Sequence, residues 1–262
     1  MLITHIFPVG SQTYKRIRRW TETLDVLKTF KPRYWFGFWC IILSGTNVAY
    51  AVENRWLYWD FTAISFLVIL AMILVIPWTK IFFHFSLFPK RVDTFPDALY
   101  VIVIGFILYL LGTLDKGISL RVIYGSLPYL FIYLAMWIVF SIPLNTVEQG
   151  RLSAPRSKPV TRLLIVLVLT LIAAVAGYIG DDPVSSTAAA VYLPFPFVTL
   201  VFPNHVRHYQ RARIYGVFIP VVFIGMRFPW FFIPLAVLFW GLRYYHYFRF
   251  GVVYPTFKVD LE

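Results

Sequence analysis

The side chains best suited to chemistry gather in two short segments, each of which begins with a Phe-Pro pair. The first reads FPKRVDTFPDALY and the second FPNHVRHYQRARIYG. In the first, Asp93 and Asp97 could share a divalent cation such as Mg²⁺ through their carboxylate oxygens. Cations and polar groups in both segments could hold a phosphate group, and these are Lys90, Arg91, Asn204, Arg207, His208, Arg211 and Arg213. In the alternative interpretation, the aspartates only favour the start of a helix and the arginines only reflect membrane topology.

Histidines suggest a second kind of chemistry. Four of the five occur where apolar segments are expected to end, namely His84, His205, His208 and His246. Imidazoles at one level of a membrane could ligate a haem, another pigment or a metal ion. The alternative is that these histidines simply occupy wet boundary positions.

Long apolar segments determine the expected architecture. The chain is 60% hydrophobic and only 14% charged, which excludes an ordinary soluble domain. Segments long enough to cross a bilayer are expected at 33–52, 57–79, 97–114, 121–143, 161–180, 186–203, 211–227 and 228–248. The pattern predicts an all-α fold, a polytopic integral membrane bundle of about eight transmembrane helices.

The distribution of positive charge predicts its orientation. If the chain crosses eight times, twenty of the 24 Lys and Arg residues fall on one side. Such a bias indicates that both termini are cytoplasmic, and we expect a bacterial inner membrane. Membrane topology and attraction to anionic lipids account for the net charge of +12, so nucleic acid is not an expected partner.

The chain divides into three expected parts. Residues 1–32 form a cytoplasmic segment in which Tyr14, Ile17, Trp20, Leu24 and Leu27 recur at helical spacing between basic residues, as in an amphipathic helix on a membrane surface. It could anchor the protein or cover a cavity as a lid. Residues 33–248 form the bundle, and residues 249–262 form a cytoplasmic tail.

Few polar groups are expected at membrane depth, chiefly Thr46 and Asn47 in the first segment. A transporter driven by protons or ions would usually carry an ionisable group there. The only cysteine, Cys40, lies in the same segment and forms no disulfide framework. Four glycines are of the kind that lets helices approach closely, and these are Gly105, Gly112, Gly177 and Gly225.

Three stretches resemble the UbiA superfamily of intramembrane prenyltransferases. The stretch LKTFKPRYWFGFWCIILSG is similar to the start of that family's first helix, and YYHYFRFGVVYPTF is similar to the ending of its lycopene-elongase-like members. The two polar segments fall where the family places its aspartate-rich motifs. The resemblance implies Mg²⁺-dependent binding of a prenyl diphosphate and alkylation of an apolar acceptor. However, PWTKIFFHFSLFPKR, where the first motif would lie, contains no carboxylate, so catalysis is left open.

Three functions follow as hypotheses. The first is a divergent UbiA-like protein that binds an isoprenoid or lipid phosphate at its cytoplasmic face. The second is a non-catalytic subunit of a photosynthetic or respiratory membrane complex, in contact with other subunits and with pigment or haem. The third is a transporter or lipid scramblase. Membrane lipids are partners in all three.

Overall fold

The computed structural model describes residues 2–24, 32–50, 91–114, 116–146, 152–155 and 157–254. The expected segment 57–79, Lys90 and His84 lie outside these ranges. Every other expected apolar segment coincides with helix, so the all-α fold is confirmed for the described residues. The elements are α1 (Leu2–Ile6), α2 (Gln12–Glu22), α3 (Pro32–Tyr50), α5 (Phe95–Leu111), α6 (Leu120–Ser141), β1 (Asn145–Thr146), β2 (Leu152–Ser153), α7 (Val160–Ile179), α8 (Pro183–Tyr192), α9 (Pro194–Val201), α10 (Val206–Arg227), η3 (Pro229–Phe231) and α11 (Phe232–Phe250).

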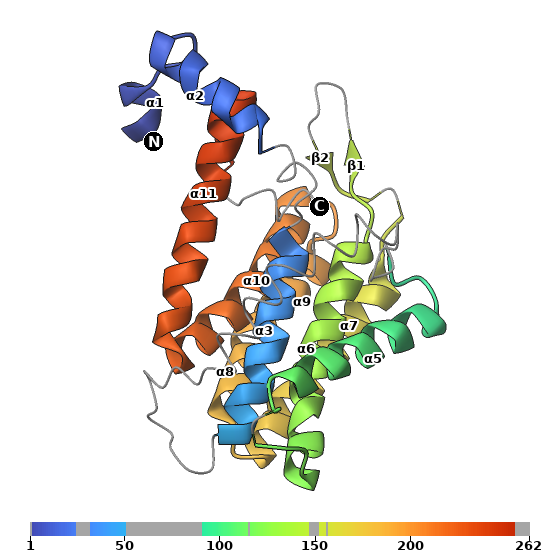
Figure 1. The fold of residues 1–262 in the computed structure, drawn as a ribbon. Helices are drawn as coiled ribbons and strands as arrows, with labels where there is room; N and C mark the ends of the chain where they lie inside the picture. Colours follow the sequence, from blue (N-terminus) through green and yellow to red (C-terminus); the bar gives the residue numbers. More distant parts are fainter. Residues whose placement is uncertain are drawn as a thin grey trace.

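Helix α6 forms the centre of the bundle (Figure 1), where it contacts α3, α5, α7, α8 and α10. In its most apolar stretch 72% of the residues are buried, against 28% in α7. A helix that is apolar all round and enclosed by others belongs to a core, whereas α7 turns apolar side chains outward. Two short strands, β1 and β2, pair antiparallel in the connection from α6 to α7.

Glycines set the closest helix crossings. A Cβ atom on Gly112 would lie 1.9 Å from the carbonyl oxygen of Ile42, and one on Gly45 would lie 2.0 Å from that of Tyr109. Helices α3 and α5 therefore touch backbone to backbone. Gly177 of α7 lies equally close to the first turn of α8, where an added Cβ would meet the Ser185 hydroxyl and lie 2.7 Å from the Ser186 backbone nitrogen. The expectation that Gly112 and Gly177 allow close packing is confirmed.

Three helical stretches in the described residues are long and apolar enough to cross a membrane. These are α6, α7 and the path Pro183–Val201, in which α8 and α9 join at Leu193 with helical backbone angles. A path of 19 residues rises about 28 Å, close to the thickness of a bilayer's hydrocarbon core.

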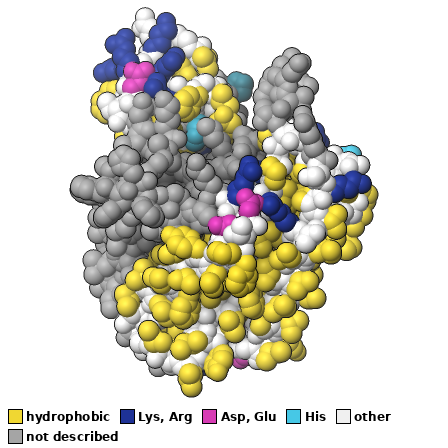
Figure 2. All heavy atoms as spheres, turned by 90° about the vertical axis from the view of Figure 1, so that its right-hand side faces the viewer, with side chains coloured by type: hydrophobic (Ala, Val, Ile, Leu, Met, Phe, Trp, Pro, Cys, Tyr) yellow, Lys and Arg dark blue, Asp and Glu magenta, His cyan; other side chains and the backbone are white. Residues whose placement is uncertain are grey.

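Large apolar side chains remain exposed along α5 and α7, including Val103, Ile107, Leu164, Val168 and Leu171. Figure 2 shows hydrophobic side chains over the lower part of this face and Lys and Arg side chains above it. We call the end of the bundle where α6 ends and α7 and α10 begin the basic end. An apolar surface of this extent requires a membrane or a partner to cover it.

The N-terminal helices dock on the last helix. Figure 1 shows α1 and α2 beside the end of α11. Tyr14 lies in a small apolar cluster with Tyr247 and Phe248. Its hydroxyl donates to the Tyr247 carbonyl at 3.1 Å, and Glu22 pairs with Arg249 at 3.1 Å. Helix α2 is amphipathic, as expected: Tyr14 and Ile17 pack on α11, whereas Trp20, also expected on the apolar face, is exposed.

Candidate functional site

The two predicted metal ligands bind protein groups. Asp97 Oδ2 accepts hydrogen bonds from the backbone N–H of Thr94 at 2.9 Å and from the Thr94 hydroxyl at 2.7 Å. Together with the return bond from the Asp97 N–H to Thr94 Oγ1, these bonds form a capping box at the start of α5. Asp93 Oδ1 pairs with Arg162 Nη2 at 2.6 Å. The described residues contain no group of three His, Cys, Asp or Glu side chains that could hold a metal, and the magnesium site stays a prediction.

Two arginines bind the end of α6. Arg213 is buried, and its Nη2 donates to the carbonyl oxygen of Ile142 at 2.7 Å. Arg162 Nη1 donates to the carbonyl oxygen of Ser141 at 2.9 Å. Carbonyls at a helix C-terminus lack helical partners and carry partial negative charge, so both contacts stabilise α6. Arg213 therefore has a structural contact at the end of α6, and its predicted binding of phosphate stays a prediction.

The other predicted phosphate ligands within the described ranges lie exposed or half-buried at the basic end. Arg91 and Asn204 are exposed, and Arg207 and Arg211 are exposed on the first turns of α10. His208 is half-buried beside them. The arrangement concentrates positive charge, but phosphate binding at these residues remains a sequence prediction.

Three of the predicted haem ligands fall in the described residues, two of them at the start of α10 and one on α11. The rings of His205 and His208 lie 5.7 Å apart and perpendicular to each other. Partial burial lowers the pKa of His208, and the charges of His205 and Arg211 lower it further. His246 is buried on α11, where its Nδ1 lies 2.7 Å from the carbonyl oxygen of Leu242. The haem or pigment site also stays a prediction.

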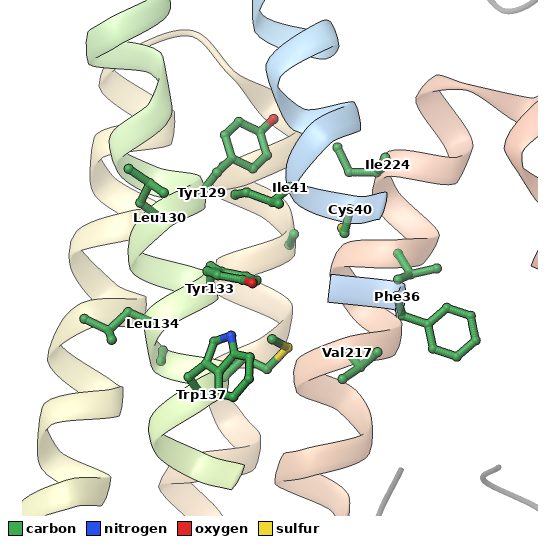
Figure 3. Close-up of a cluster of buried hydrophobic side chains, with 14 of the residues drawn as sticks. Phe36, Cys40, Ile41, Tyr129, Leu130, Tyr133, Leu134, Trp137, Val217 and Ile224 are labelled. Atoms are coloured by element: carbon green, nitrogen blue, oxygen red, sulfur yellow. The ribbon is translucent and has the colours of Figure 1, made fainter. Parts of the chain in front are cut away.

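The clearest candidate site is an apolar pocket between α3, α6, α8 and α10, and the space in and in front of it, part of which is open to the surface, measures about 460 Å³. Its walls include Cys40 on α3, Tyr133 on α6, Ala188 on α8 and Val217 on α10. In Figure 3, Tyr129, Tyr133 and Trp137 project from α6 toward the space that Cys40 and Val217 border. Small residues and Pro220 line the wall formed by α8 and α10, which leaves room there.

A polar cluster joins the helices at the end opposite the basic end. Arg227 Nε donates to Asn47 Oδ1 at 2.9 Å, and Asn47 Nδ2 donates to the Tyr129 hydroxyl at 2.9 Å. Asn47 also reaches Asp182 Oδ1, which accepts from the Val184 N–H at the start of α8. Tyr129 belongs to both this cluster and the pocket wall.

Sequence reasoning missed the pocket. Asn47 and Pro220 are visible as a polar residue and a helix breaker in apolar segments, and each is a reason to look for partners. Their partners come from other helices, however, and no local spacing encodes those pairings.

Comparisons with models of protein families, with curated proteins and with solved structures find no match to this chain. The resemblance to the UbiA superfamily therefore rests on the sequence stretches alone.

Proposed function

We propose that this chain is an integral membrane protein that binds the hydrocarbon chain of an isoprenoid or another lipid in the pocket between α3, α6, α8 and α10. The observation that carries the proposal is the pocket itself, which is lined almost wholly by apolar side chains. Burial of each methylene group there is worth about 0.8 kcal/mol.

In this proposal the chain crosses the bacterial inner membrane about eight times with both termini in the cytoplasm. The three apolar helices and the exposed apolar faces of α5 and α7 support the membrane location. Positive charge at the basic end supports a cytoplasmic position for that end.

Helix α2 lies on the cytoplasmic leaflet as an interfacial helix. Its face toward α11 carries Tyr14 and Ile17, and its other sides expose Trp20 and several basic residues: Lys15, Arg16, Arg18 and Arg19. Basic side chains attract anionic head groups, and an exposed Trp suits the interface. The contacts with Tyr247 and Arg249 favour the role of anchor over that of a lid, because they fix α2 to α11.

The extent of the pocket along the helices suits a chain-like ligand. Its α3 wall runs from Phe36 to Ser44 and its α10 wall from Gly216 to Ile224. Each wall spans about 12 Å along its helix axis. An elongated apolar site matches a hydrocarbon chain, and the resemblance to the UbiA superfamily makes an isoprenoid the first candidate.

Prenyl transfer remains a prediction and is not part of this proposal. Magnesium-dependent departure of diphosphate needs several oxygen ligands near the leaving group. Asp93 pairs with Arg162 and Asp97 caps α5. The contacts of the described residues therefore support lipid binding but not prenyl transfer.

The test is native mass spectrometry of the protein extracted without overexpression. We expect a copurifying isoprenoid or other lipid that survives gentle detergent exchange. The variant Ala188→Leu fills the pocket and should release the lipid. The control Ala190→Leu makes the same change at an exposed position two residues along α8 and should retain it. Retention by both variants, or copurification of stoichiometric partner chains without lipid, would overturn the proposal.

A further inference from the structure

A buried hydroxyl group beside Gly216, a residue of the pocket wall, has no hydrogen-bond partner among the described residues. Tyr192, the last residue of α8, is 0% exposed. Its hydroxyl is one of the buried polar atoms that find no partner among the described residues. Such orphaned groups are rare in folded proteins because burial strips them of water, and each calls for an explanation.

The Tyr192 hydroxyl lies against Gly216, which lines the pocket. A Cβ atom on Gly216 would approach that hydroxyl to 3.1 Å and the edge of the ring to 3.3 Å. Glycine at this position therefore lets the phenol pack closely against α10 where that helix borders the pocket. A larger residue would push the ring away.

A backbone acceptor at the same place lacks its helical donor. Pro220 lies one turn after Gly216 in α10 and has no N–H, so it cannot donate to the Gly216 carbonyl. The proline ring also crowds that carbonyl. Gly216 and Pro220 both line the pocket. Tyr192 can donate or accept a hydrogen bond, and the carbonyl can only accept one.

We propose that Tyr192 and the Gly216 carbonyl bind a neutral hydroxyl group on the lipid, so that the ligand is a long-chain alcohol such as a prenol. A hydroxyl can accept from Tyr192 and donate to the carbonyl at the same time. This inference rests on the proposed function, because it assumes that a hydrocarbon chain occupies the pocket. A phosphate head group fits less well, because a charged group would lose hydration in an apolar site with no cation among its lining residues.

The experiment measures the affinity of the full chain in nanodiscs for farnesol, farnesyl methyl ether, farnesyl phosphate and the parent hydrocarbon. We expect farnesol to bind most tightly, because its hydroxyl can both donate and accept a hydrogen bond. The ether can only accept one, and the hydrocarbon can neither donate nor accept. One neutral hydrogen bond corresponds to about a fivefold to tenfold change in affinity.

Tyr192→Phe removes only the hydroxyl. It should lower the affinity for farnesol about tenfold and leave the affinity for the hydrocarbon unchanged. The melting temperature of the ligand-free protein should stay equal or rise, because the substitution removes an unsatisfied buried group. Tyr209→Phe is a matched control. The Tyr209 hydroxyl is also buried with no partner in the described residues, but Tyr209 lies in a separate cluster with Ile142 and Leu163. That variant should bind every probe as the wild type does.

The outcomes separate the two proposals. If no farnesyl probe binds, the proposed function fails and this inference fails with it. If all probes bind equally, if the phosphate binds most tightly, or if Tyr192→Phe binds farnesol unchanged, only the head-group assignment is overturned. If Tyr192→Phe does not fold, the order of the affinities of the four probes for the wild type still decides whether the head-group assignment holds.

Discussion

Arg213 and Arg227, which lie before and after the pocket-lining residues of α10, hold this helix to different neighbours. Arg213 Nη2 donates to the carbonyl oxygen of Ile142 just beyond α6, and Arg227 Nε donates to Asn47 Oδ1 on α3. Between them α10 contributes Gly216, Val217, Pro220 and Ile224 to the pocket wall. The pocket therefore lies between two polar contacts that fix α10 against the bundle.

Replacing Arg213 should destabilise the protein. Arg213→Ala removes a charged donor from a buried carbonyl, and we expect a loss of about 2 kcal/mol in unfolding free energy. Arg213→Lys should recover part of that loss, because a lysine donates but lacks the planar fork. Thermal unfolding in detergent measures the effect. Arg211→Ala, an exposed arginine two residues earlier, is the control and should change stability by less than about 0.5 kcal/mol. Equal melting temperatures for the two alanine variants would contradict the role of Arg213.

Asn47 and Arg227 should be energetically coupled. Each single alanine substitution leaves the other polar group, the buried Asn47 or the half-buried Arg227, with fewer partners. The double variant should therefore lose less stability than the two single losses added together. We expect a coupling of about 1 to 3 kcal/mol. The pair Glu22 and Arg249, which is partly exposed, serves as a reference and should couple by less than about 1 kcal/mol. Strict additivity for Asn47 and Arg227 would show that their contact contributes nothing.

Gly112 should tolerate no larger residue. Gly112→Ala places a methyl group against the Ile42 backbone, at 1.9 Å from its carbonyl oxygen, so α3 and α5 must separate. We expect a loss of about 3 kcal/mol, measured as a lower melting temperature. Gly241→Ala is the matched control, because nothing lies within 4 Å of the added atom. It should be neutral or stabilising by about 0.5 to 1 kcal/mol. A variant at position 112 that is as stable as the one at position 241 would refute this crossing.

His208 should make stability depend on pH. Its pKa lies below the ordinary value of 6.5, first because of partial burial and then because of the charges of His205 and Arg211. Protonation of His208 is therefore less favourable in the folded state than in the unfolded state. The contribution of neutral His208 to the free energy of unfolding is complete above the ordinary pKa and is lost as pH falls through the folded-state pKa. His208→Gln should flatten the decline in melting temperature between about pH 7 and pH 5. An unchanged slope would show that His208 plays no part.

The sequence alone predicts much of the fold, because a long apolar run needs no partner to be recognised. The described apolar helices α3, α5 to α10 and α11 lie where those runs predict them, and Gly112 and Gly177 make the close approaches expected of small residues. The expected segments 211–227 and 228–248 adjoin directly, and in the structure the short helix η3 joins α10 to α11.

The candidate site could not be predicted in the same way. Asp97 lies four residues after Asp93, a spacing that suits two metal ligands, yet it also lies three residues after Thr94, which is the spacing of a capping box. Arg213 obeys the positive-inside pattern, and only the fold shows that it binds the end of α6. The pocket depends on which faces of four helices meet, and this is a property of tertiary packing that periodicity does not specify.

Photo-crosslinking with a diazirine-bearing isoprenoid, followed by mapping of the labelled peptides, tests the central claim most directly. We predict labels on the pocket side chains, chiefly Tyr133, Met136 and Val217, and competition by unlabelled farnesol. Labels confined to the exposed faces of α5 and α7, at residues such as Ile107 and Val168, would show that the probe meets only the outer surface and would contradict a lipid site in the pocket.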